Sequence, residues 1–212
     1  MTRALLLDLD GTLVDSIPCW IDAYRETLAS FGRPLGHAEF LATIYQRSAS
    51  VRTVLESLQV GVSEAEFRRV RDGRYLEYLG SRVAWLPGAE AFLADAARPL
   101  GIVTNSWRAY VDAIDRHLGV RSRVDTLVDL EDAGDRPKPD GHPLELAAER
   151  LGAEAARCIY VGDQAHDMAA ARAAGMEAWL LQRPETPEAA VGLADVVLAD
   201  LPALAAAWAA DA

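Results

Sequence analysis

Two aspartates separated by one residue, Asp8 and Asp10, follow directly on an apolar run at residues 4–7. A short apolar run of this kind predicts a buried strand, and Gly11 ends it. Open α/β sheets place their ligands at the carboxyl ends of strands, and a turn at Gly11 can bring both carboxylates to one crevice. One carboxylate could attack a phosphorus atom or bind a metal while the other moves a proton. Taken alone, the pair is equally compatible with an acidic turn that caps the next helix.

Hydroxyl and amide side chains follow a second apolar run, in the sequence Thr104-Asn105-Ser106. A hydroxyl and the backbone N–H groups of such a turn suit a phosphoryl oxygen. Asn105 or Ser106 could instead cap the helix that we expect to follow. The two roles can coexist.

A lysine stands between two prolines in the loop sequence Pro137-Lys138-Pro139. The prolines restrict the backbone around Lys138 and could hold its ammonium group in one direction. A fixed cation there would offset the charge of a phosphoryl group and of nearby acids. A basic turn in solvent is the alternative, and Arg136 is a rival cation in the same loop.

Two further acids, Asp163 and Asp167, follow the apolar run at residues 159–161. If a helix begins by then, a spacing of four residues places both carboxylates on one side of it. Together with Asp8 they would form an oxygen-rich site, which suits Mg²⁺ better than Zn²⁺. Acids are also common in the first turn of a helix, where they interact favourably with its dipole.

Strand-like and helix-like segments alternate through most of the chain, which predicts a doubly wound, Rossmann-like parallel sheet with helices on both faces. The expected strands are residues 3–8, 100–104, 124–128, 158–161, 178–181 and 196–198. The expected helices are residues 89–97, 108–118, 142–151, 167–174 and 202–209. Each chemical motif then lies at the end of an expected strand or in the loop that follows it.

A purely helical pattern interrupts this alternation after the first strand. One helix is expected from Ile17 to about Phe31, and others at residues 37–46, 49–59 and 63–79, the last with a capping-box start at Ser63. We therefore predict an α/β catalytic core of residues 1–14 and 86–212. A helical cap domain of residues 15–85 would be inserted into it.

The composition limits the partners and the compartment. Hydrophobic residues make up 51% and charged residues 25% of the 212 residues, which is ordinary for a soluble globular protein. The formal net charge of −11 argues against nucleic acid or an anionic membrane as a partner. No apolar stretch approaches the roughly 20 residues of a membrane span, and the first residues lack the pattern of a secretory signal. Cys19 and Cys158 lack metal-site spacing and suit a reducing compartment. We expect a cytoplasmic monomer or homodimer.

In combination, the motifs resemble those of the haloacid dehalogenase-like superfamily. Residues 8–16 resemble its first motif, residues 102–105 its second, Lys138-Pro139 its third, and residues 161–163 with Asp167 its fourth. Residues 169–176 resemble the helix and turn that usually follow. The motif likeness covers essentially the whole core. The insert resembles the helical cap of the phosphoglycolate phosphatase and β-phosphoglucomutase branch.

The resemblance implies a role for each matching residue. Asp8 would attack phosphorus and become an aspartyl phosphate. Asp10 would protonate the leaving alcohol and then deprotonate the hydrolytic water. Thr104 and Asn105 would hold phosphoryl oxygens, and Lys138 would neutralise charge.

The resemblance also implies a Mg²⁺ ion and a phosphate-binding loop. The implied ligands are Asp8, the backbone carbonyl of Asp10, and Asp163, with Asp167 either a ligand or adjacent to one. Gly11 and Thr12 belong to the implied phosphate-binding loop. The chain departs from the common pattern at Leu9 in place of phenylalanine, at Gly141 in place of a second proline, and at Gln164 in place of serine. None of these departures removes a reacting group.

Other polar residues allow two interpretations each. Arg47 or Arg52 in the cap could meet a substrate carboxylate or a second phosphate, or could lie on a solvated helix face. Trp107 with Arg108 could line the entrance to the site, or could be a core tryptophan beside an arginine in solvent. We expect His166 to point outward from the first turn of its helix.

The sequence therefore predicts a Mg²⁺-dependent phosphatase that acts on a small phosphorylated metabolite, similar to phosphoglycolate or a sugar phosphate. A phosphomutase would use the same aspartyl phosphate and is the main alternative. A dehalogenase would need neither the proton from Asp10 nor the metal. A phosphorylated signalling receiver would be shorter and would lack the insert.

Overall fold

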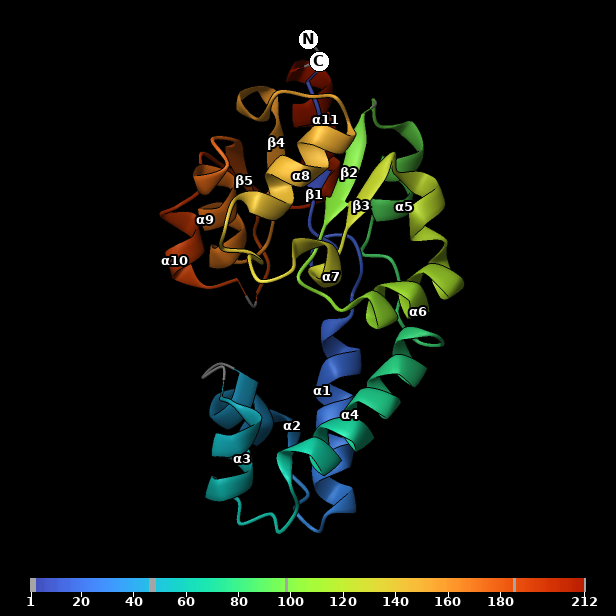
Figure 1. The fold of residues 1–212 in the computed structure, drawn as a ribbon, viewed down its shortest axis with the longest axis vertical. Coiled ribbons are helices and arrows are strands. Elements are labelled where there is room, and N and C mark those ends of the chain that lie inside the picture. Colours follow the sequence, from blue (N-terminus) through green and yellow to red (C-terminus); the bar gives the residue numbers. More distant parts are fainter. Residues whose placement is uncertain (1–2, 46–48, 98, 185, 212) are drawn as a thin grey trace. The chain divides into compact units, whose positions relative to one another are not determined.

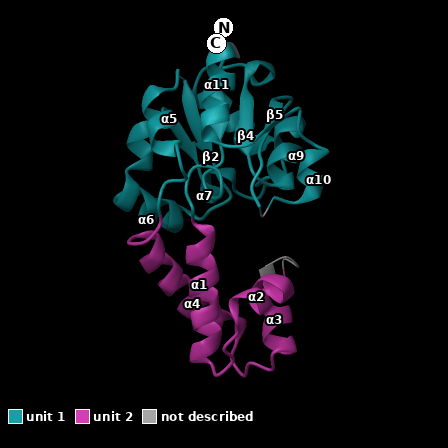
Figure 2. Ribbon diagram, turned by 180° about the vertical axis from the view of Figure 1, so that it is seen from behind, with its two compact units in different colours: residues 1–15, 84–212 teal, residues 16–83 magenta. Residues whose placement is uncertain are grey.

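The computed structural model describes residues 3–45, 49–97, 99–184 and 186–211. The chain divides into two compact units, residues 1–15 with 84–212 and residues 16–83 (Figure 2). The two crossings between the units lie side by side, because Asp15 N–H donates to the Ala84 carbonyl at 2.9 Å.

The larger unit is built on a six-stranded parallel sheet of order β3-β2-β1-β4-β5-β6 (Figure 1). Its strands are β1 (Leu5–Leu7), β2 (Leu100–Val103), β3 (Thr126–Val128), β4 (Ile159–Gly162), β5 (Glu177–Leu181) and β6 (Val196–Leu198). From β1 the chain builds the sheet first toward β3 and then, from β4, in the opposite direction. The neighbouring strands β1 and β4 therefore form the switch point at which doubly wound sheets bind ligands.

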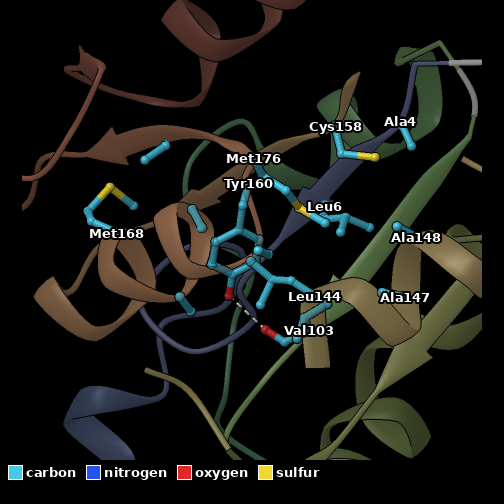
Figure 3. Close-up of a cluster of buried hydrophobic side chains, with 14 of the residues drawn as sticks. Ala4, Leu6, Val103, Leu144, Ala147, Ala148, Cys158, Tyr160, Met168 and Met176 are labelled. Atoms are coloured by element: carbon cyan, nitrogen blue, oxygen red, sulfur yellow. Dashed lines mark hydrogen bonds between the residues drawn. The ribbon is translucent and has the colours of Figure 1, made fainter. Parts of the chain in front are cut away.

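The central strands are apolar along their length because helices cover both faces of the sheet. The helices of this unit are α5 (Ala89–Asp95), α6 (Arg108–Leu118), α7 (Leu130–Ala133), α8 (His142–Arg150), α9 (Ala165–Ala173), α10 (Glu188–Val191) and α11 (Leu201–Asp211), with 3₁₀ turns at Val120–Arg123 and Ala155–Arg157. Helices α8 and α9 pack on one face, over a buried cluster that includes Leu6, Val103, Leu144, Tyr160 and Met168 (Figure 3).

The six expected strands and the doubly wound fold are confirmed. Two helices were not predicted, α7 and α10, each of four residues. One turn of helix is too short to show a period in the sequence. Helix α9 begins at Ala165, two residues before the expected start at Asp167.

The regular elements in the described part of the smaller unit are helices joined by short loops. It contains α1 (Ile17–Ser30), α2 (His37–Phe40), a π-helical turn (Leu41–Tyr45), α3 (Val51–Ser57) and α4 (Glu64–Leu79). Its core combines aliphatic side chains with an aromatic cluster, in which the Tyr24 ring lies 5.4 Å from that of Phe40 and 5.1 Å from that of Phe67. The Ser63 hydroxyl accepts from Glu66 N–H at 3.2 Å, so Ser63 is the N-cap of α4 and makes its half of the predicted capping box.

Candidate active site

The first aspartate follows β1 and the loop after it turns back on itself. Asp8 N–H donates to the Val161 carbonyl at 2.8 Å, which joins the loop to β4. Gly11 has a φ of +83°, and a Cβ there would lie 2.7 Å from Asp163 Oδ2. Only glycine fits this position without strain, because the backbone is left-handed and the neighbouring carboxylate is in contact. The turn thus brings the ends of β1 and β4 together.

Lys138, the only lysine of the chain, is buried among acceptors. Its Nζ lies 2.6 Å from Asp8 Oδ1, 2.7 Å from Asp167 Oδ1 and 2.7 Å from the Tyr160 hydroxyl. The Val103 carbonyl is 3.2 Å away. The alternative of a basic turn in solvent is therefore wrong for Lys138.

Asn105 fixes the backbone of the lysine loop. Its Nδ2 donates to the Lys138 carbonyl at 2.9 Å, and its Oδ1 accepts from Lys138 N–H at 3.0 Å. Arg136, the rival cation, instead pairs with Asp140 at 2.9 Å and is half-exposed. The end of β2 thus sets the position of Lys138 from 33 residues away.

The hydroxyls after β2 point to the second aspartate of the first motif. Ser106 Oγ donates to Asp10 Oδ2 at 2.6 Å, and Thr104 Oγ1 donates to the same oxygen at 3.4 Å. The Thr104 hydroxyl also accepts from Ser106 N–H at 3.0 Å. The interpretation of Asn105 or Ser106 as a helix cap is wrong, because the N-cap of α6 is Trp107.

Three buried carboxylates meet beside the lysine. Asp8, Asp163 and Asp167 each offer an oxygen, and these oxygens all lie within 4.8 Å of one another. Asp167 Oδ2 accepts from Gln164 N–H at 3.0 Å, and Asp163 Oδ2 accepts from Gln164 Nε2 at 2.7 Å. Asp163 Oδ1 is buried and has no hydrogen-bond partner among the described residues.

This arrangement fits a hard divalent cation. Three carboxylates face one ammonium group, so negative charge is in excess, and a buried carboxylate oxygen stands without a donor. Carboxylate oxygens are the ligands that Mg²⁺ and Ca²⁺ take in proteins. The residues predicted as ligands from the fourth motif are thus brought together with Asp8.

Burial and the neighbouring charges move the pKa values of the three acids in different directions. Burial raises the pKa of Asp8 despite the Lys138 ammonium, and Asp167 and Asp163 add to the rise. Burial, reinforced by Asp167, raises the pKa of Asp163 to about 7. Burial is also the largest influence on Asp167, but Lys138, His166 and the Gln164 N–H together outweigh it and lower the pKa of that carboxyl. The two acids that share Lys138 therefore differ in their affinity for a proton.

Comparison with known proteins decides the family. Residues 2–175 match the haloacid dehalogenase-like hydrolases. The chain belongs to this family. A phosphoglycolate phosphatase from Xanthomonas campestris pv. campestris is 35% identical to it over 182 residues, covering 82% of this chain and 80% of that protein. An N-acetylmuramic acid 6-phosphate phosphatase from Pseudomonas aeruginosa is 29% identical over 179 residues, covering 82% of this chain and 78% of that protein.

A solved structure of the same family has the same fold. It is a haloacid dehalogenase-like hydrolase from Deinococcus radiodurans R1 with bound phosphate and sodium. It is 28% identical, with a TM-score of 0.80 over 98% of this chain and 95% of that one. The family predicted from the motifs is confirmed.

Several contacts of this haloacid dehalogenase-like site were not predicted from the sequence, including the Asn105 side chain on the Lys138 backbone. The others are the hydroxyl of Tyr160 on Lys138, the hydroxyl of Ser106 on Asp10, and the side chain of Gln164 on Asp163. Figure 3 shows the Tyr160 ring inside the apolar cluster with its hydroxyl directed at the Val103 carbonyl, 2.9 Å away. A buried tyrosine in an otherwise aliphatic strand was the available signal, since such a hydroxyl usually has a partner.

The structure also shows the surroundings of the predicted residues Thr12, Trp107 and Arg108. Thr12 is fully buried, and its hydroxyl has no partner among the described residues. Trp107 is 55% exposed, so it is not a core residue. Arg108 is not simply in solvent, because it binds both carboxylate oxygens of Asp129 at 2.7 and 2.9 Å.

The predicted cap arginines and His166 also have defined positions or lie outside the described residues. Arg52 pairs with Glu64 at 2.8 Å on the surface of the smaller unit. Arg47 lies outside the described residues. His166 is partly exposed and has its Nε2 3.6 Å from Asp167 Oδ1. None of the helices in the described part of the chain combines the length and the apolar character that a bilayer span requires.

Proposed function

We propose that this hydrolase is a Mg²⁺-dependent phosphatase that acts on a small phosphorylated metabolite through an aspartyl phosphate. The observation that carries the proposal is the buried Lys138 ammonium between Asp8 and Asp167, at the switch point of the sheet. Phosphoryl transfer depends mainly on positioning and charge neutralisation, and this site supplies both.

In the proposed reaction Asp8 is the nucleophile. Lys138 holds Asp8 Oδ1, which leaves Oδ2 to attack the phosphorus atom. A phosphorus–oxygen bond forms to Asp8, and the bond to the substrate oxygen breaks. Water then attacks the phosphorus, which releases inorganic phosphate and restores the Asp8 carboxylate.

Asp10 transfers the protons in this proposal. It gives a proton to the leaving alkoxide and later takes one from the attacking water. The hydroxyls of Ser106 and Thr104 converge on Asp10 Oδ2 and hold this carboxyl in place. Hydrogen bonds of this kind reduce the reorganisation that a proton transfer would otherwise require.

Asp8, Asp163 and the backbone carbonyl of Asp10 would hold Mg²⁺, with Asp167 beside them. When bound, the ion supplies positive charge to the phosphoryl oxygens. The unpartnered Oδ1 of Asp163 supports this assignment, because a cation would satisfy it. Thr104, Gly11 and Thr12 would contact the phosphoryl group.

The names of the relatives suggest two substrate classes, a two-carbon phosphorylated acid and a phosphorylated amino sugar. We propose that residues 16–83 act as a cap that excludes water during catalysis. The two cysteines of the chain, Cys19 and Cys158, are both buried, which suits the cytoplasm as the compartment.

A phosphate-release assay tests the proposed function. The panel contains phosphoglycolate, N-acetylmuramic acid 6-phosphate, sugar phosphates and pyrophosphate, each with Mg²⁺ and with EDTA. We expect Mg²⁺-dependent release from at least one small monoester and none from Asp8→Asn. Release by Asp8→Asn at the rate of the unchanged protein would refute the mechanism, and rearrangement of a sugar phosphate without release would indicate a mutase.

A further inference from the structure

Gln164 contacts both acids of the fourth motif through two different donors. Its backbone N–H donates to Asp167 Oδ2 at 3.0 Å. Its side-chain Nε2 donates to Asp163 Oδ2 at 2.7 Å. The residue is the N-cap of α9 and is half-buried, so it lies directly between β4 and the helix.

The side-chain contact distinguishes the two oxygens of Asp163. Oδ2 accepts from Gln164 and also lies against Gly11, where a Cβ would be only 2.7 Å away. Oδ1 is buried and has no partner among the described residues. A carboxylate without the Gln164 contact could exchange its two oxygens by rotation, whereas the contact selects one orientation.

We propose that Gln164 is a positioning residue for the divalent cation: its side-chain amide holds Asp163 Oδ2 and leaves Oδ1 as the metal-facing oxygen. The inference rests on the proposed function, because it assumes that Asp163 is a metal ligand. Groups that hydrogen-bond a ligating carboxylate fix its orientation, and their removal typically weakens metal binding 10- to 100-fold.

Gln164 is well suited to this role because of its length. Serine, the common residue at this place in the pattern that the sequence resembles, carries its hydroxyl on Cβ. The amide of glutamine lies two carbons further out and reaches the distal oxygen of the neighbouring carboxylate. The backbone N–H that holds Asp167 is present with either side chain, so that contact remains when the side chain of Gln164 is replaced.

The test is a titration of the full metal-free chain with Mg²⁺ by calorimetry. Gln164→Met keeps the length of the side chain and removes the donor. Gln182→Met is the matched control, because Gln182 is an exposed glutamine that directly follows β5, the strand next to β4. We expect the Kd for Mg²⁺ to rise 10- to 100-fold in Gln164→Met and to change less than twofold in Gln182→Met.

Kinetics separate a positioning role from a general structural one. In Gln164→Met we expect the Mg²⁺ concentration for half-maximal phosphate release to rise in parallel with Kd. The kcat at saturating Mg²⁺ should stay within a few-fold of the original value. If Gln164→Met does not fold, as judged by thermal melting in EDTA, Gln164→Ser replaces it and should weaken binding in the same way.

Failure of the inference about Gln164 and failure of the proposed function give different results. If Gln164→Met binds Mg²⁺ as tightly as the unchanged protein, or loses kcat at saturating Mg²⁺ with its Kd unchanged, the inference about Gln164 is wrong. If the unchanged protein itself does not bind Mg²⁺, the proposed metal-dependent function fails.

Discussion

Replacing Lys138 with methionine tests the central contact of the site. The change keeps the length of the side chain but removes a charge that is 2.6 Å from Asp8 and 2.7 Å from Asp167. Breaking a buried ion pair on one side costs about 3–5 kcal/mol, because the partner charge stays buried without compensation. Domains of ordinary stability have about 5–15 kcal/mol in total, so the variant should fold but with a small margin.

The destabilisation of Lys138→Met should depend on pH in a defined direction. Burial already raises the pKa of Asp8, and loss of the ammonium would raise it further. An acid whose folded-state pKa lies above its unfolded value loses stability as the pH rises through the folded-state pKa. The loss should therefore be largest above neutral pH and should shrink toward pH 5. Urea unfolding in EDTA, followed by circular dichroism at pH 5 and above neutral pH, measures this loss of stability.

Activity supplies the second readout for Lys138→Met. Loss of one preorganised donor to developing charge typically lowers kcat about 10²- to 10³-fold. Arg136→Met is the matched control, since Arg136 lies in the same loop and pairs with Asp140 at the surface. The control should retain both stability and phosphate release. The reasoning would be refuted if Lys138→Met were as stable and as active as Arg136→Met.

Three further predictions concern neighbouring contacts. Tyr160→Phe should lower the free energy of unfolding by about 1–3 kcal/mol, because the Tyr160 hydroxyl contacts Lys138 Nζ. Tyr24→Phe should not lower it, because the buried Tyr24 hydroxyl has no partner among the described residues. Urea unfolding of the two variants makes the comparison. Burial raises the pKa of Asp163 to about 7, so below that pH a proton should compete with the metal for this carboxylate. Calorimetry should therefore show the affinity for Mg²⁺ falling about tenfold per pH unit from pH 7 to pH 5, with little change above pH 8. Gly11→Ala should lose both affinity for Mg²⁺ and stability, because its Cβ would press on Asp163. Gly32 has the same left-handed backbone, but a Cβ there would have nothing within 4 Å, so Gly32→Ala should lose stability alone.

Much of this site follows from where the apolar runs of the sequence end. A buried parallel strand is a nearly continuous apolar run, so its end is visible, and carboxyl ends of parallel strands share one edge of the sheet. This is why Asp8, Thr104 and Asp163 could be predicted to converge. The action of the helical insert as a cap and the role of Arg47 stay predictions.

The contacts that were not predicted depend on distant parts of the chain. Ser106 meets Asp10 across 96 positions, and Tyr160 meets Lys138 across 22. No local pattern reports such pairs, because hydroxyl partners are set by the register of strands and by loop direction. Arg108 illustrates the same limit: its surroundings follow from Asp129, which the unpredicted helix α7 places against it.

The arrangement of charges explains why Lys138 and the metal would have different tasks. The lysine ammonium is fully buried, and four acceptors surround its three N–H groups, so it is fixed in place. Its contact with Asp167 keeps that carboxyl ionised, which in turn raises the pKa of Asp163. In the proposed function Asp8 and Asp167 would hold the lysine, and Asp163 would exchange a proton for a cation near neutral pH. A phosphatase built this way would load its metal reversibly without losing the ammonium group that orients the nucleophile.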